Sequence, residues 1–78
     1  MIGKIVSFDN DEKYLMLLEE NIENKKFLIG IKIVSDKYTN EFKLFLEKKK
    51  DDDILLEEIQ DEELLKVLVN SYILDNLN

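Results

Sequence analysis

Hydrophobic and polar residues alternate along residues 26–34, which predicts a β-strand in this part of the chain. One face of this strand carries Phe27, Ile29, Ile31 and Ile33, and the other, more mixed face carries Leu28, Gly30, Lys32 and Val34. Because Gly30 has no side chain, we expect either close packing by a covering helix at this position or a β-bulge. Close packing is the more ordinary explanation.

The same alternation returns in residues 41–47, which are expected to form a hairpin with the preceding strand. Phe42, Leu44 and Leu46 lie on one face of this segment, and Glu41, Lys43, Phe45 and Glu47 lie on the other. A polar loop over residues 35–40 is predicted to join the two strands.

Two shorter segments are also predicted to be strands. Residues 2–8 are rich in β-branched side chains, which favour extended structure, and an acidic turn over residues 9–12 follows them. After a charged reversal at residues 48–53, residues 54–59 are expected to form a short strand at an edge of the sheet. Charged side chains on such a strand discourage unwanted pairing.

Residues 13–24 are compatible with two structures. Leu15, Leu18 and Ile22 recur at a helical spacing, and polar residues stand just before the segment as possible N-caps. However, residues 14–18 are all apolar, which fits a buried strand equally well. The hydrophobic pattern alone leaves both interpretations open.

The clearest helix is predicted from about Asp61 to Leu77. Asp61 is the expected N-cap, and the acids in the first turn complement the positive end of the helix dipole. If Gln60 is the cap instead, Ile59 and Leu64 form a hydrophobic staple. The expected core face of the helix is the stripe of Leu64, Leu65, Leu68, Val69 and Tyr72.

A second apolar ridge of this helix, formed by Val67, Leu74 and Leu77, lies on another side. On a small protein such a ridge is a candidate surface for a homodimer or for a protein partner. The alternative is that loops cover the ridge or that the chain end frays.

These elements predict one α+β domain over residues 1–78, with an antiparallel sheet of four to five strands covered by a C-terminal helix. The chain contains neither Cys nor His, so disulfides and zinc fingers are excluded and no cofactor is expected. No stretch approaches the roughly 18 apolar residues of a membrane span, and no leader pattern is present. We therefore expect a cytoplasmic protein without membrane contact.

The net charge of −7 is distributed unevenly along the chain. Residues 1–50 carry a net charge of +1, whereas residues 51–78 carry −8. All eleven basic residues are Lys, and Arg is the usual residue for bidentate contacts to bases and phosphates. Direct binding to nucleic acid is therefore not expected. The bias toward Asn, Ile and Lys is typical of AT-rich bacterial or phage genomes.

The apolar ridge and the acidic residues each support a functional hypothesis. In the first, the protein is a non-enzymatic domain that acts through protein–protein contacts. In the second, it is an acidic inhibitor that imitates a nucleic-acid backbone and occupies a basic groove of a host protein. The candidate acidic face comprises Asp51, Asp52, Asp53, Glu57, Glu58 and Glu62. The ordinary alternative is that these charges only keep the surface solvated.

No motif in the chain indicates an enzyme. Catalytic triads that use His or Cys are excluded, and two glycines are too few for a phosphate-binding loop. A calcium-binding EF-hand loop that begins at Asp51 would have Leu55 and Leu56 where it needs an oxygen ligand and a glycine. We therefore expect neither catalytic nor metal-binding residues.

Two passages of the sequence resemble the YrzB-like family of small acidic bacterial proteins. They are Lys-Lys-Phe-Leu-Ile-Gly-Ile over residues 25–31 and Leu-Leu-Glu-Glu-Ile-Gln-Asp-Glu-Glu-Leu over residues 55–64. The resemblance spans nearly the whole chain and implies that residues 13–20 form a strand. It implies no known activity, substrate or cofactor.

Overall fold

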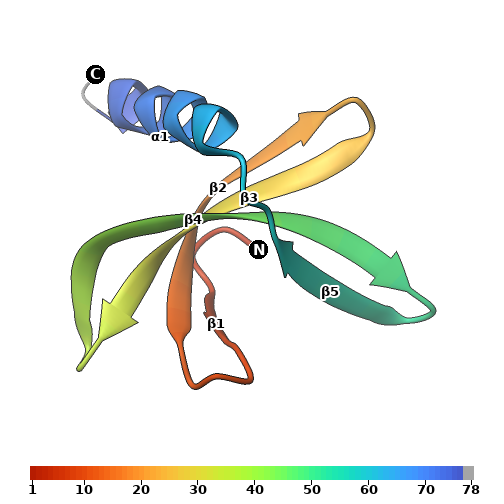
Figure 1. Cartoon of the computed structure of the whole chain (residues 1–78), viewed down its shortest axis with the longest axis horizontal. Helices are drawn as coiled ribbons and strands as arrows, with labels where there is room; N and C mark the ends of the chain where they lie inside the picture. Colours follow the sequence, from red (N-terminus) through yellow and green to blue (C-terminus); the bar gives the residue numbers. More distant parts are fainter. Residues whose placement is uncertain (77–78) are drawn as a thin grey trace.

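The computed structural model describes residues 1–76, which form five strands followed by one helix. Each strand is antiparallel to its neighbour in the order β1-β2-β3-β4-β5, so the sheet is a meander (Figure 1). The predicted fold class, an antiparallel sheet covered by one C-terminal helix, is confirmed. The elements are β1 (Ile5–Ser7), β2 (Lys13–Ile22), β3 (Lys25–Val34), β4 (Lys37–Lys50), β5 (Asp53–Glu58) and α1 (Glu62–Asn76).

The ambiguous residues 13–24 contain β2, so the helical interpretation is wrong. Tyr14 and Met16 are buried on one face of the sheet, and Leu18 packs on the opposite face. A bulge between Met16 and Leu18 places one extra residue, Leu17, in the strand. The run of apolar residues therefore reflects a strand that is covered on both faces.

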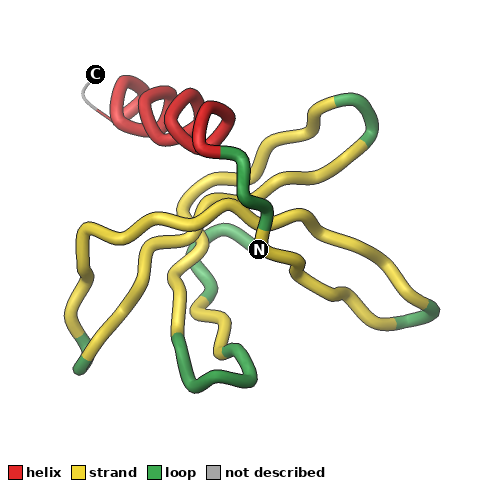
Figure 2. Tube along the Cα trace, viewed as in Figure 1, coloured by secondary structure: helices red, strands yellow, loops and turns green. Residues whose placement is uncertain are grey.

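Tight turns connect the long strands (Figure 2). These turns are shorter than the sequence suggested. The expected loop over residues 35–40 is wrong, because only Ser35 and Asp36 form the turn and β4 begins at Lys37. Both turn residues have positive φ, at 52° and 63°. Two such residues in a row match the twist of a hairpin, so the strands begin at once on either side.

The predicted reversal over residues 48–53 is also too long, since β4 extends to Lys50 and only Asp51 and Asp52 lie between the strands. β5 is the last strand in the sheet order, which confirms the prediction of an edge strand. β1 is shorter than predicted, although Gly3 N–H still donates to the carbonyl of Met16 at 2.8 Å.

One hydrophobic core lies between α1 and the sheet. Ile29, Leu44 and Leu68 are its buried centre, and they come from β3, β4 and α1. Around this centre pack Leu18, Phe27, Phe42, Ile59, Leu64, Leu65 and Val69. The predicted core stripe of the helix is thereby confirmed for Leu64, Leu65, Leu68 and Val69.

A second core lies on the face of the curled sheet opposite α1. Its buried residues are Tyr14, Met16, Leu28 and Phe45, with Met1, Val6, Phe8 and Leu56 packed against them. Phe8 stacks on Phe45 with ring centroids 5.1 Å apart, and Tyr14 meets both rings edge-on. The mixed faces of β3 and β4 are therefore core faces as well.

Gly30 belongs to this second core, so the expected close approach of the helix at Gly30 is wrong. A Cβ at this position would lie 3.1 Å from Met16 Cε, 3.1 Å from Tyr14 Cβ and 3.2 Å from Phe45 Cε2. The nearest bulge puts its extra residue in β2. Close packing does explain Gly30, but the packing partners are side chains of the sheet.

Asp61 caps α1 as predicted. Its Oδ1 accepts a hydrogen bond from the backbone N–H of Leu64 at 3.1 Å, which satisfies one of the free donors of the first turn. The helix begins at Glu62 and is described to Asn76. The predicted last residue of the helix, Leu77, lies outside the described residues.

Candidate interaction surfaces

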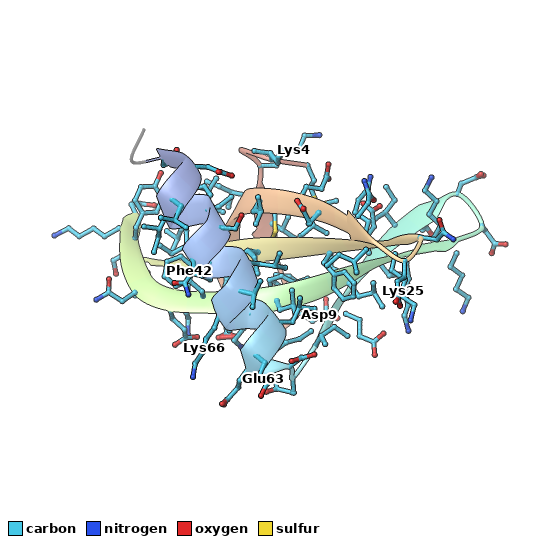
Figure 3. All side chains as sticks on the ribbon, turned by 90° about the horizontal axis from the view of Figure 1, so that it is seen from above. Lys4, Asp9, Lys25, Phe42, Glu63 and Lys66 are labelled. Atoms are coloured by element: carbon cyan, nitrogen blue, oxygen red, sulfur yellow. The ribbon has the colours of Figure 1, made fainter. Side chains whose placement is uncertain are left out.

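The outer side of α1 carries part of the apolar ridge that the sequence predicted. Val67 and Leu74 are 62% and 63% exposed. They stand seven residues apart, about two helical turns, and therefore lie on the same side of the helix. The third predicted member, Leu77, lies outside the described residues. Figure 3 looks onto this side of the molecule, where α1 crosses the strands of the sheet.

An apolar groove lies along the other flank of α1, beside the C-terminal half of the helix. It has a volume of about 370 Å³. Tyr38 at its edge is 68% exposed. The lining residues are Leu15, Leu17, Ile31, Tyr38, Phe42, Tyr72 and Ile73. They come from three strands and the helix, so the hydrophobic pattern of the sequence did not reveal the groove, although the apolar run at residues 14–18 contributes two of its members.

The six residues of the predicted acidic face do not form one surface. Glu57 and Glu58 are consecutive in β5 and point to opposite faces of the sheet. Glu57 forms an ion pair with Lys48, and Glu58 accepts a hydrogen bond from Lys43 at 3.2 Å. Both carboxylates are therefore already paired within the sheet.

The remaining members of the acidic face lie at two separate places. Asp51, Asp52 and Asp53 stand at the far end of the β4–β5 hairpin, whereas Glu62 is the first residue of α1 (Figure 1). The six residues of β5 separate the two places by roughly 20 Å, at about 3.3 Å per residue. The hypothesis of an acidic mimic stays a prediction, and the structure brings none of these groups together into one continuous face.

Five charged side chains form a network at the edge of the second core, which we call the rim network. Lys32 lies 2.9 Å from Glu12 and 3.8 Å from Glu41, and Lys43 lies 3.6 Å from Glu12. The contact between Lys43 and Glu58 extends the network to β5. It ties the β1–β2 turn to three strands, and every carboxylate in it faces a lysine.

The rim network also surrounds the hydroxyl of the buried Tyr14. This hydroxyl donates to Glu41 at 3.3 Å, and the Lys43 ammonium lies 5.5 Å from the centre of the ring. Burial raises the pKa of Tyr14, and the Tyr14 hydroxyl, followed by Glu58, raises the pKa of Lys43. The hydrogen bond from Lys32 lowers the pKa of Glu12. Such balanced pairing is typical of a structural network.

Acid should weaken the rim network through Glu12. Because the folded-state pKa of Glu12 lies below its usual value of 4.5, its contribution to stability is present above that pH and is lost as the pH falls through the folded-state pKa. We expect unfolding curves measured from about pH 6 to about pH 3 to show a smaller loss of stability for Glu12→Gln than for the native protein. Glu20→Gln, on an exposed carboxylate of β2, is the matched control. Equal slopes for the native protein and Glu12→Gln would contradict this role.

Among residues 1–76, no three acidic side chains converge on a position that would hold a metal ion. No helix in the same part of the chain is long and apolar enough to cross a membrane.

Comparisons with protein-family models, with curated proteins and with solved structures found no match for this chain. The resemblance to the YrzB-like family therefore stays a prediction.

Proposed function

We propose that this protein is a non-enzymatic domain that acts through protein–protein contacts, with the outer side of α1 as its contact surface. The observation that supports this proposal is the exposure of Val67 and Leu74 on one side of a helix whose opposite side is already packed on the sheet. A cytoplasmic location belongs to the same proposal, because the chain has no Cys to form disulfides in an oxidising compartment.

Burial of these side chains would supply the affinity. Removing a Val or Leu side chain completely from water contributes about 1.5–3 kcal/mol. The exposed Ile73 and Tyr38 beside the groove extend the apolar area to the other flank of the helix. Exposed apolar patches of this kind on a small protein mark sites of interaction with other proteins.

The first partner to test is a second copy of the chain. We expect the weight-average mass, measured by sedimentation equilibrium over a wide range of concentration, to rise above that of the monomer. Val67→Glu should shift the association to at least roughly tenfold higher concentration, because a carboxylate would have to be buried at the contact. Val67 is exposed, so this change should leave the unfolding curve nearly unaltered.

Asn21→Asp is the matched control, since it adds the same charge to an exposed position near the end of β2, off the helix. It should leave self-association unchanged. A strict monomer at all concentrations would remove the homodimer. Binding of a partner protein that tolerates Val67→Glu as well as Asn21→Asp would overturn the proposal for this surface.

A further inference from the structure

The outer edge of β5 is a second, independent place where this chain can bind another protein. Among residues 1–76, β5 pairs with β4 alone, and it is the last strand of the sheet. Figure 1 shows the β4–β5 hairpin extending away from α1 at the side of the molecule. An edge strand of this kind presents a row of backbone donors and acceptors that a further strand can use.

The register shows which backbone groups point outward. Ile59 N–H donates to the carbonyl of Leu44 in β4 at 2.9 Å. In an antiparallel pair, residues whose backbone groups bond the neighbouring strand alternate with residues whose backbone groups point away from it. The backbone groups of residues an odd number of positions from Ile59 therefore point away from β4. These positions are Ile54, Leu56 and Glu58. The two-residue turn before β5 sets the same alternation.

Apart from its three carboxylates, β5 lacks the features that usually protect an edge. It contains no Lys and no Pro, and its pairing with β4 runs without a bulge. Ile54 and Leu55 are 51% and 50% exposed, and they point to opposite faces of the sheet. A strand added beside β5 would therefore cover apolar surface on both of its faces.

The charge of this region selects the kind of strand that fits. β5 itself carries three carboxylates, Asp53, Glu57 and Glu58, and no basic residue. A second copy paired antiparallel about Leu55 would place Asp53 of one copy opposite Glu57 of the other, and like charges directly opposite are unfavourable. Within the chain, β5 pairs with the lysine-rich strand β4 through the ion pair of Glu57 with Lys48. The outer edge therefore favours a basic strand.

We infer that the outer edge of β5 binds an extended basic peptide segment of another protein by β-strand addition. Its backbone pairs with the outward groups of Ile54, Leu56 and Glu58. Its apolar side chains cover Ile54 on the face opposite α1. On the other face, alternate Lys or Arg side chains lie beside Asp53 and share Glu57 with Lys48.

The probe is a fluorescent, end-capped peptide of about eight residues with alternating Lys and Val, the length of an ordinary strand. Anisotropy titrations against the full chain should show binding that weakens as salt rises. A peptide with Glu in place of Lys should not bind. A third peptide, with Lys and Val unchanged but alternate backbone nitrogens methylated, should lose binding because it cannot form the ladder.

Ile54→Pro tests the edge from the protein side. Ile54 N–H points outward, so proline removes a donor for the partner and keeps every bond to β4. We expect the affinity for the Lys–Val peptide to fall roughly tenfold, whereas Ile54→Ala, the control for the lost side chain, should weaken binding less. Asp53→Asn should reduce the salt dependence. Val67→Glu should leave peptide binding unchanged, which separates this site from the surface proposed on α1.

Amide chemical shifts complete the test, and they apply even if Ile54→Pro fails to fold. The expected result is that the Lys–Val peptide perturbs residues 53–58. Perturbations confined to other strands, equal binding of the Glu peptide, or equal binding of the methylated peptide would each overturn the inference. Self-association of the native chain that Ile54→Pro abolishes would overturn it in favour of a second copy at this edge.

Discussion

Replacing Leu28 with Ala should destabilise this protein by about 2–5 kcal/mol. Leu28 is fully buried in the second core, between Tyr14, Met16 and Phe45. The substitution removes apolar contacts and leaves a cavity that a sheet fixed by backbone pairing cannot close. For a chain of 78 residues, the free energy of unfolding is expected to be about 4–12 kcal/mol. This single change should therefore remove a large part of it.

The comparison with Ile29→Ala makes this prediction specific. Leu28 and Ile29 are consecutive in β3, both are buried, and they belong to different cores on opposite faces of the sheet. We expect the free energies of unfolding of the two variants, measured in urea, to fall by similar amounts. Val34→Ala, at a half-exposed position of the same strand, should lose much less. A small loss for Leu28→Ala beside a large loss for Ile29→Ala would contradict a second core.

Local patterns of the sequence predicted the parts of this fold that depend on neighbouring residues. Alternation along residues 26–34 assigned Phe27 and Ile29 correctly to one face of their strand, and alternation along residues 41–47 did the same for Phe42 and Leu44. The polar residue before the acidic first turn identified Asp61 as the cap of α1. In each case a short-range periodicity or a side chain that bonds its own backbone carries the information.

The sequence did not predict features that depend on how the sheet curls. Residues 13–24 were ambiguous because both faces of β2 are covered, which produces an apolar run without a period. The polar residues after Asp36 suggested a loop, but a pair of positive-φ residues allows β4 to begin at Lys37. These residues are polar because the end of the hairpin is exposed to solvent, although they belong to a strand.

The candidate sites illustrate the same limit. The exposed positions of Val67 and Leu74 follow from helical spacing, so the ridge could be read from the sequence. In contrast, the groove and the rim network join side chains from three or more strands, and their formation depends on register. The acidic residues were close in sequence, yet strand alternation separates Glu57 from Glu58. Proximity along the chain was therefore a poor guide to a shared surface.

Gly30→Val should destabilise the protein by about 1–3 kcal/mol through overpacking of the second core. The backbone of Gly30 is not in the positive-φ region, so a Cβ is opposed only by its surroundings. Those surroundings lie 3.1–3.2 Å from the position of the Cβ on Met16, Tyr14 and Phe45. The Cβ of Ala already approaches all three side chains, of which only the end of Met16 is flexible, and the two methyl groups of Val add further crowding.

A double-mutant cycle with Met16→Ala distinguishes overpacking from other causes. Met16→Ala alone should cost about 2–5 kcal/mol because the side chain is fully buried. In the double variant the valine occupies part of the space that the methionine leaves, so the loss should be smaller than the sum of the two single losses. Urea unfolding of all four proteins measures this coupling. Strict additivity would show that Gly30 is required for a reason other than the close approach of Met16.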